Sequence, residues 1–389
     1  MKYNTILAAA VSAAMLMACG PKYVKPAASA PSPEEPSSNV EFALNFFQKA
    51  NHTISPDENL LLSPYSAGVA LSMLEEGAEG ETKAEFDNAL ANHLYRAENL
   101  GSNDTVIVES ASSVWISDNF SVRNRYVSLL ENYYDAFITT QNFSDPATVK
   151  AINNWCGENT AGKINHILNE LTPNDVMVLI NALYFNAPWA EEFDPKQTSS
   201  STFKGMKEDR EVQMMQKKDS FEYAEYQGCQ MVRLPYAGGR YSMLVVLPPH
   251  NWDINTIIPY INESMYDAAM DIISTREVIL QMPKFKLETE LILNKTLNKM
   301  GIWTAFDGAA DFKGISAMGP LSLGMVKQKC YIDVTEKGTE AAAVTVAQVR
   351  LTSARPMPVT RMTVDRPFLF LIADAQTDNI LFAGKVVNL

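Results

Sequence analysis

The order of apolar and polar residues predicts several helices in the first half of the chain. Apolar side chains recur at helical spacing in four segments, 40–47, 64–74, 125–136 and 149–168. The second segment has clear boundaries, because Ser63 supplies a capping hydroxyl, Pro64 fits the first helical position and Gly77 supplies a stop. We therefore expect a helix after Pro64 that is buried on most of its faces.

Short apolar runs predict strands along the rest of the chain. They cover 106–108, 113–116, 176–185, 243–247, 278–282, 368–372 and 380–382. Several are continuously apolar, which is typical of strands that are covered on both faces. Because strands dominate after Asn181, the pattern predicts an α+β fold rather than a regular alternation of strand and helix.

The composition indicates a single large globular domain. Of the 389 residues 47% are hydrophobic, which is enough for a large core and excludes a disordered chain. We find no internal repeat and no linker rich in proline and serine after residue 38, so we expect one domain over 39–389. The net charge of −13 has the wrong sign for a nucleic-acid partner.

The first 38 residues have a different character. An apolar run over 6–17 ends in Leu16-Met17-Ala18-Cys19-Gly20, which resembles a bacterial lipobox. We expect 1–18 to be a signal peptide, Cys19 to carry the lipid and the proline-rich 19–38 to be a tether. An ordinary secretory signal is the alternative. The expected location is extracytoplasmic, on the outer membrane, facing either the periplasm or the exterior.

Familiar catalytic motifs are absent from the sequence. The four histidines, His52, His93, His166 and His250, form no zinc motif, and the chain has no nucleophile elbow, Walker loop or dinucleotide fingerprint. We expect no catalytic residue, metal or cofactor, although an unrecognised hydrolase remains an alternative. We also expect no disulfide between the three internal cysteines, Cys156, Cys229 and Cys330, because their wide spacing has no regular pattern.

Residues 336–355 are the part of the chain that ordinary structure explains least. They read EKGTEAAAVTVAQVRLTSAR, and every second residue from Thr339 to Val349 is uncharged and of small or moderate size. This period of two gives one face suited to burial and one suited to water. Helix propensity is also good near Glu340, and Gly338 allows a hinge. The segment is therefore an exposed loop, an inserted strand or a permanent edge strand.

The same residues carry a family resemblance. The segment 336–343, Glu-Lys-Gly-Thr-Glu-Ala-Ala-Ala, resembles the hinge of the serpins. Four further motifs resemble serpin segments in the same order along the chain: Asn59-Leu60-Leu61-Leu62-Ser63-Pro64-Tyr65-Ser66, then Ile152-Asn153-Asn154-Trp155, then Asn181-Ala182-Leu183-Tyr184-Phe185 with Trp189, and last Asp365-Arg366-Pro367-Phe368 with Gly384-Lys385-Val386.

The resemblance implies a fold and a mechanism. It implies a large mixed central sheet with smaller sheets, about eight or nine helices and an exposed reactive loop over about 337–358. In serpins the cleaved loop enters the central sheet as an additional strand and traps the protease as an acyl-enzyme. The hinge residues are Glu336, Gly338, Thr339, Glu340, Ala341, Ala342 and Ala343. The residues at the sheet opening are Ser63, Ser66, Asn181, Trp189 and Gln328, where many animal serpins have histidine at the last of these positions.

The resemblance also implies the bond that a protease cuts. With Glu336 as the seventeenth residue before the cut, the reactive bond is Thr352-Ser353. A shifted register would place the cut after Arg350, Leu351 or Arg355, with correspondingly different target proteases. We therefore expect an inhibitor, not an enzyme, that forms a one-to-one covalent complex with serine proteases and is otherwise a monomer. A non-inhibitory binding protein is the alternative. We expect no heparin-like activator, because Arg96 is the only basic residue over 89–103.

Overall fold

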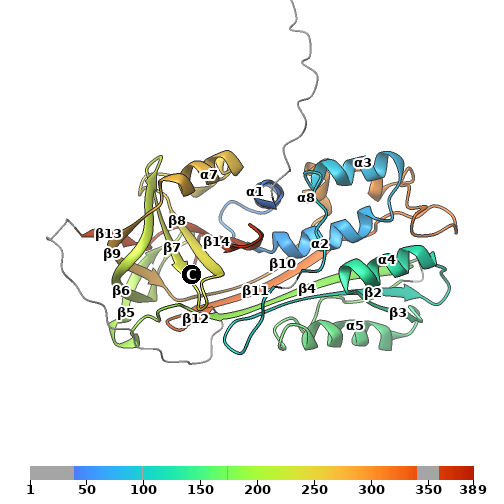
Figure 1. The fold of residues 1–389 in the computed structure, drawn as a ribbon, viewed down its shortest axis with the longest axis horizontal. Coiled ribbons are helices and arrows are strands. Elements are labelled where there is room, and N and C mark those ends of the chain that lie inside the picture. The colour runs from blue at the N-terminus through green and yellow to red at the C-terminus, as the bar shows by residue number, and fades with distance from the viewer. Residues whose placement is uncertain (1–38, 99, 173, 340–358) are drawn as a thin grey trace, which may run out of the picture. The chain divides into compact units, whose positions relative to one another are not determined.

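Two β-sheets and eight α-helices make up the described part of the chain (Figure 1). The computed structural model describes residues 39–98, 100–172, 174–339 and 359–389. Its helices are α1 (Asn39–Asn51), α2 (Pro64–Glu75), α3 (Gly80–Ala89), α4 (Asn124–Tyr134), α5 (Pro146–Glu158), α6 (Ile254–Ile257), α7 (Glu263–Ile272) and α8 (Asn294–Lys299). The predicted mixture of α and β structure in one fold is confirmed.

The nine-stranded sheet contains most of the C-terminal strands. Its strands are β1 (Leu60–Leu62), β5 (Ser199–Lys204), β6 (Asp209–Tyr226), β7 (Cys229–Pro235), β8 (Tyr241–Leu247), β9 (Ser274–Pro283), β13 (Thr360–Thr363), β14 (Phe368–Asp374) and β15 (Ile380–Val386). The order is β1-β15-β14-β8-β7-β6-β9-β13, with β5 paired to β6. The sheet is mixed, because β13 runs parallel to β9 while the other pairs are antiparallel. Residues of β14 and β15 lie in the main hydrophobic core.

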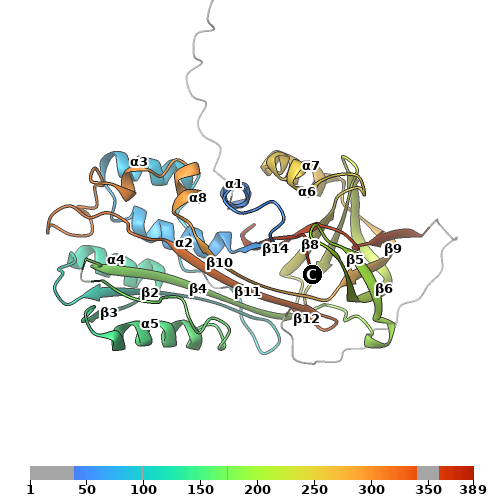
Figure 2. The same ribbon diagram turned by 180° about the vertical axis from the view of Figure 1, so that it is seen from behind.

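The six-stranded sheet is long and lies between helices (Figures 1 and 2). Its strands are β2 (Ile107–Ser117), β3 (Phe137–Gln141), β4 (Met177–Pro188), β10 (Phe285–Ile292), β11 (Lys327–Thr335) and β12 (Gly338–Thr339), in the order β10-β11-β12-β4-β2-β3. Both views place α2 on one face and α5 on the other. On the α5 side, Ile152 packs with Trp115 and Phe143 in a small separate core.

The helix after Pro64 forms as its sequence predicts. Ser63 caps it, and its hydroxyl accepts a hydrogen bond from the Ser66 amide at 3.2 Å. All residues of α2 except Ala70 are buried, which matches its almost wholly apolar sequence. This helix packs against β4 of the six-stranded sheet and β15 of the nine-stranded sheet, and it contributes to the site described below.

The helix expected over 149–168 is shorter than predicted. It ends at Glu158, and Ala161 and Gly162 have positive φ angles of 47° and 78°. The Thr160 hydroxyl donates to the Cys156 carbonyl at 2.7 Å and accepts from the Ile164 amide at 3.0 Å. These local bonds compete with helix continuation. The sequence pattern also missed α3, α6, α7 and α8, none of which is longer than ten residues.

Candidate functional site

The centre of the six-stranded sheet has an opening between β4 and β11. The short strand β12 pairs antiparallel with both, through Thr339 opposite Ala187 on β4 and opposite Val334 on β11. We call the end of the opening at β12 its upper end, and the end near Met177 on β4 and Lys327 on β11 its lower end. Below β12, the described residues of β4 and β11 have ladder partners on their outer sides only, in β2 and β10. Adjacent strands lie about 4.8 Å apart, so two strands that share β12 are separated by the width of one strand.

A cavity of about 230 Å³ occupies the lower part of this opening. Its walls are residues 177–182 of β4 and 327–329 of β11, with α2 on one side and the segment 164–176 on the other. Most of the lining is apolar, and the first five residues of β4 are only half-buried. An apolar strand face without a full covering indicates a surface that is complete only when another segment occupies it.

The hinge residue Thr339 closes the upper end of the opening. Its side chain is 1% exposed, and its hydroxyl shares a hydrogen bond of 2.6 Å with the Tyr236 hydroxyl. Tyr236 stacks on Trp189 with ring centroids 4.5 Å apart, and the Trp189 indole donates to the Thr335 carbonyl at 3.0 Å. Burial raises the pKa of Tyr236, which keeps the phenol protonated. Thr339 thus enters the sheet without a charge to desolvate.

Gly338 is required for this close approach. Its φ angle is 147°, and a Cβ atom on it would lie 2.3 Å from the Ala187 carbonyl oxygen and 2.5 Å from the Pro188 Cα. Both obstacles are backbone atoms that have no freedom to move aside. Any other residue at position 338 would force β12 away from β4.

Glu336 anchors the turn that precedes the hinge. Its carboxylate accepts from the Thr198 hydroxyl at 2.9 Å and pairs with the Lys284 ammonium at 2.9 Å. Its carbonyl accepts from the Phe193 amide at 2.9 Å. Burial of the Glu336 carboxyl alone would raise its pKa, but the bonds from Lys284 and Thr198 outweigh burial and hold the pKa below its usual range. The turn is therefore held by a charged carboxylate.

Gln328 fastens the start of β11 to the N-terminus of α2. Its side-chain oxygen accepts from the Ser63 amide at 3.1 Å, and its side-chain nitrogen donates to the Ser63 carbonyl at 2.8 Å. Both bonds of this amide therefore go to Ser63. A two-bond contact to one backbone unit uses both functions of the amide.

Asn181 and Ser66 connect β4 to its surroundings. The Ser66 hydroxyl donates to the Asn181 carbonyl at 3.2 Å, and the Asn181 amide nitrogen donates to the hydroxyls of Ser110 and Ser112 at 3.1 and 3.0 Å. The Asn181 side-chain oxygen is buried without a partner among the described residues. A buried acceptor without a partner is costly, so it indicates a group that bonds in another state of the molecule or to water.

Asn153 on α5 holds the segment that covers the lower opening. Its side-chain oxygen accepts from the amides of Ile167 and Leu168 at 2.8 and 2.9 Å, and its nitrogen donates to the Leu168 carbonyl at 2.8 Å. Ile167 and Leu168 both line the cavity. One side chain therefore fixes the lower wall of the opening to α5.

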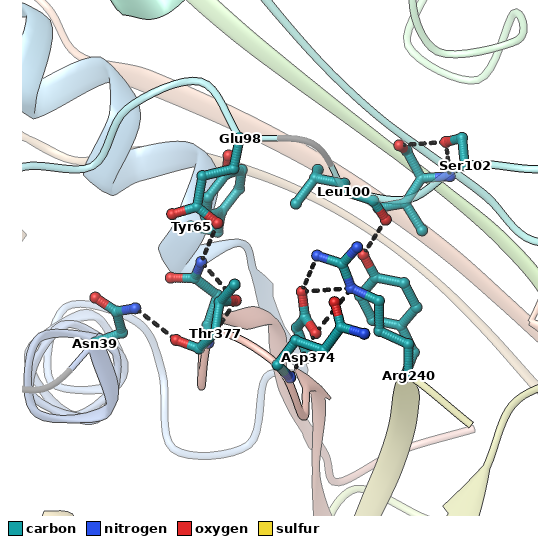
Figure 3. A network of polar contacts seen from close by, with 12 residues as sticks. Asn39, Tyr65, Glu98, Leu100, Ser102, Arg240, Asp374 and Thr377 are labelled. Carbon is teal, nitrogen blue, oxygen red and sulfur yellow. Dashed lines mark hydrogen bonds and ion pairs between the residues drawn. The ribbon is translucent and has the colours of Figure 1, made fainter. Parts of the chain in front are cut away.

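The described residues between α3 and β2 form a turn followed by an irregular segment. Figure 3 shows Glu98 and Leu100 on this segment beside the ends of β8 and β14. The Leu100 carbonyl accepts from the Tyr241 hydroxyl, Glu98 accepts from Asn379, and the adjoining Arg240 pairs with the buried Asp374 at 2.6 Å. No helix forms over the described residues of 90–106. Arg96, the basic residue noted in this region, pairs with Glu76 at 3.4 Å.

Sequence reasoning identified one side of the hinge contact and missed the other. It proposed Thr339, Trp189 and Glu336, which the fold brings together, but not Tyr236, Lys284 or Thr198. These last three are distant in sequence, and no local pattern marks them as partners of the hinge.

The described residues also hold no cluster of three metal-ligating side chains and no helix long and apolar enough to span a membrane. Cys156, Cys229 and Cys330 are buried free thiols.

Several predicted residues lie outside the described residues. They are the lipidation candidate Cys19, the hinge residues Glu340, Ala341, Ala342 and Ala343, and the reactive-bond candidates Arg350, Leu351, Thr352, Ser353 and Arg355. The proposed signal peptide and tether over 1–38 also lie outside. These assignments remain predictions from the sequence.

The family model for serpins, serine protease inhibitors, matches residues 37–389. An uncharacterized serpin-like protein of Methanosarcina acetivorans is 34% identical over 349 residues, which cover 85% of this chain and 81% of that protein. The chain belongs to the serpin family. Membership agrees with the sheet opening and with the hinge at its upper end.

Solved structures show the same fold. The thermophilic serpin tengpin in its native state has a TM-score of 0.83 at 30% identity, covering 93% of this chain and 96% of that chain. Tengpin in its latent state has a TM-score of 0.78 at 30% identity, covering 90% and 97%. Thyroxine-binding globulin in complex with thyroxine has a TM-score of 0.78 at 28% identity, covering 90% and 98%. Of the two tengpin states, the described structure is more similar to the native one.

Proposed function

We propose that this serpin inhibits serine endopeptidases as a suicide substrate, with cysteine endopeptidases as a second target class. The observation that carries the proposal is the opening between β4 and β11, which is one strand wide and already holds Gly338 and Thr339 at its upper end. The protease serine would attack the carbonyl carbon of Thr352. The Thr352–Ser353 bond would break, Ser353 would leave as a new amino terminus, and Thr352 would stay esterified to the protease.

The register of β12 supports insertion of the loop that follows it. Because Thr339 lies opposite Ala187 and Val334, continued antiparallel pairing would place Thr345 opposite Asn181 on β4 and Gln328 on β11. Ala341, Ala343 and Thr345 would then share the buried face of Thr339. The Thr345 hydroxyl would reach the unpartnered side-chain oxygen of Asn181. Each of these side chains is small enough for that face.

Insertion would carry the esterified protease a long way. About 14 inserted residues at roughly 3.4 Å each would move Thr352 some 45–50 Å from the upper to the lower end of the sheet. Distortion of the protease active site would stop deacylation. The edges of β4 and β11 that face each other have no ladder partners below β12 among the described residues. They would supply hydrogen-bond partners on both sides of the new strand.

The deciding experiment mixes the protein with trypsin, chymotrypsin and elastase. We expect a one-to-one adduct that survives detergent, and a released C-terminal peptide whose mass identifies the new amino terminus as Ser353. We also expect the cleaved protein to melt at a much higher temperature than the intact one. Absence of an adduct with all three proteases, under conditions in which the loop is cut, would refute inhibition of these classes.

A non-inhibitory binding role is the second candidate. It is favoured by the likeness to thyroxine-binding globulin, whose structure contains thyroxine. In that role, cleavage of the loop would raise the melting temperature little and would yield no adduct. The uncharged residues at every second position from Thr339 to Val349 favour inhibition, because a charge or proline on that face would obstruct insertion.

We also propose that Cys19 carries a lipid and that the protein acts at a membrane surface outside the cytoplasm. The apolar run before Leu16-Met17-Ala18-Cys19 supports this assignment. Expression of the full chain and of Cys19→Ala in a bacterial host tests it. We expect only the unmodified sequence to yield a lipidated N-terminal peptide in mass spectrometry and to sediment with membranes.

A further inference from the structure

A buried carboxyl group lies where α2 meets α3. Glu75 is the last residue of α2, and its side chain is only 4% exposed. The Lys83 ammonium on α3 lies 2.7 Å from a carboxyl oxygen of Glu75 and 2.7 Å from a carboxyl oxygen of Asp87. Three ionisable groups from two helices therefore share one contact. We refer to these three residues as the carboxyl corner.

The surroundings of Glu75 disfavour its ionised form. The C-terminal end of a helix carries a partial negative charge, and the last turn of α2 contains no basic residue to offset it. The Asp87 carboxyl is within hydrogen-bonding reach of Glu75, so two negative charges would meet there. One ammonium, shared between both carboxyls, cannot neutralise them both. The uncharged form of Glu75 is therefore favoured, and its carboxyl proton can be donated to Asp87.

The two carboxyls of the corner differ in how firmly they hold a proton. Burial raises the pKa of Glu75 from 4.5 to about 7, and Asp87 adds to the rise while Lys83 offsets part of it. Burial alone would also raise the pKa of Asp87, but its hydrogen bonds with Glu75 and Lys83 outweigh burial and lower that pKa. Glu75 therefore holds a proton under conditions in which Asp87 is charged.

Other ionisable groups near this end of α2 behave differently. On α4, burial raises the pKa of Tyr134, so its phenol stays protonated and donates to Glu76. Arg96 stays charged and also pairs with Glu76. Burial lowers the pKa of His93, which follows α3, below its usual value. The other elements packed against α2 carry ionisable groups whose effects on Glu75 are smaller than those of the corner itself: Glu41 and Lys49 on α1, Tyr184 on β4 and Lys385 on β15.

We propose that the carboxyl corner is a pH-sensitive contact that holds α2 to α3. Under mildly acidic conditions Glu75 keeps its proton and donates it to Asp87, while Lys83 binds both carboxyls. Around neutral pH the proton passes to water, and two carboxylates then face one ammonium. The contact weakens at the end of the helix whose Leu71 and Leu74 line the opening. This proposal does not depend on protease inhibition.

Ionisation of Glu75 lowers the stability of the folded chain. Between pH 4.5 and about 7 the folded chain holds a proton on Glu75 that the unfolded chain has lost. The stability that this proton contributes is complete below pH 4.5 and is lost as pH rises to about 7. His93 acts in the opposite direction, because its lowered pKa makes the folded chain more stable as pH rises.

Thermal unfolding of the full chain at pH 5 and pH 8 tests the proposal. Glu75→Gln copies the protonated side chain, because its amide can donate to Asp87 and its carbonyl can accept from Lys83. We expect the melting temperature of this variant, relative to the unmodified protein, to rise by about 3 °C from pH 5 to pH 8. The control Glu76→Gln removes a neighbouring carboxyl outside the corner and should show the same difference at both pH values. A difference for Glu75→Gln that does not change with pH would overturn the proposal.

Infrared titration tests the same proton if Glu75→Gln does not fold. The unmodified protein should show a protonated-carboxyl band at pH 6 that is lost by pH 8. Asp87→Asn removes the neighbouring negative charge, so this band should disappear at a lower pH. Identical titration of the unmodified protein and Asp87→Asn would contradict the shared proton.

Hydrogen–deuterium exchange locates the change in the molecule. After correction for the intrinsic exchange rate, amides of residues 70–89 should lose protection between pH 5 and pH 8. Amides of β14 should keep theirs. Equal loss in both regions, or loss in β14 alone, would overturn the assignment of the pH effect to the carboxyl corner.

Discussion

The two sheets of the molecule differ in how completely their central strands are paired. In the nine-stranded sheet, β14 bonds along its length to β8 on one side and to β15 on the other, and every residue of β15 is buried. In the six-stranded sheet, β4 pairs with β2 along most of its length, but among the described residues it pairs only with Gly338 and Thr339 on its other edge. Similar apolar sequences thus form strands that are paired on both edges in one sheet, and a strand with an edge that is mostly unpaired among the described residues in the other.

This difference identifies where the molecule can still gain stability. A hydrogen bond contributes a net of about 1 kcal/mol to the free energy of unfolding. Full burial of an apolar side chain contributes about 1.5–3 kcal/mol more. The central strands of the nine-stranded sheet already have these hydrogen bonds and this apolar burial. The open edges of β4 and β11 do not, so a strand added there would stabilise the molecule by many such contributions together.

Blocking the hinge should erase the difference between intact and cleaved protein. Thr339→Arg places a charge where the side chain is 1% exposed and contacts Tyr236. Burial of an unpaired charge costs several kcal/mol, so the hinge would stay outside the sheet. We expect cleavage without adduct, a loss of inhibition of about a hundredfold or more, and no rise in melting temperature after cleavage.

The control for this variant is Val359→Arg, which adds the same charge at an exposed position beyond the loop. It should inhibit as the unmodified protein does. Undiminished adduct formation by Thr339→Arg would refute entry of the hinge into the sheet as the inhibitory step.

Removing the Gln328 amide should weaken the six-stranded sheet before insertion. Gln328→Ala leaves the Ser63 amide and carbonyl without their side-chain partners. The expected loss is about 1–3 kcal/mol of unfolding free energy. Urea unfolding of the intact protein measures it, with Gln230→Ala on β7 as the control in the other sheet. An unchanged midpoint would show that water replaces the amide fully.

Thr345→Val tests the register of the proposed inserted strand. Valine has nearly the shape of threonine but lacks the hydroxyl that would bond to Asn181 after insertion. We expect the intact variant to melt as the unmodified protein does, because the bond belongs only to the inserted state. The cleaved variant should lose about 1 kcal/mol of its gain in stability. A loss of equal size in the intact protein would contradict the register.

The sequence predicted the hinge and six of the strands, β2, β4, β8, β9, β14 and β15, but neither the other strands of the two sheets nor the partners that hold the hinge. The apolar runs 368–372 and 380–382 became β14 and β15 because continuous apolar sequence is stable in a fully paired sheet. The prediction of a helix over 149–168 was wrong beyond Glu158, because the hydrogen bonds of the Thr160 hydroxyl replace helical ones. Tyr236 and Lys284 could not be assigned to the hinge, because their contacts with Thr339 and Glu336 join parts of the chain that no periodicity relates.

A buried lysine in the nine-stranded sheet should have the smallest effect on the stability gained by loop cleavage, and it distinguishes the two sheets by pH. Lys385 on β15 is fully buried and donates to the Pro56 carbonyl and the Asn255 side-chain oxygen, both at 3.1 Å. Burial lowers the pKa of Lys385 from 10.5 to about 8, and the nearby Asp253, Glu58 and Asp57 offset only part of this. The unfolded chain therefore binds more protons between these values, so the contribution of Lys385 to stability grows as pH rises from 8 towards 10.5. We expect the melting temperature of Lys385→Met to rise by a few degrees less over this range than that of the unmodified protein. Because Lys385 lies far from the opening in the chain's pairing order, the gain in stability on loop cleavage should be the same in both proteins at each pH. A different gain in stability on loop cleavage in this variant would show that the two sheets are energetically coupled.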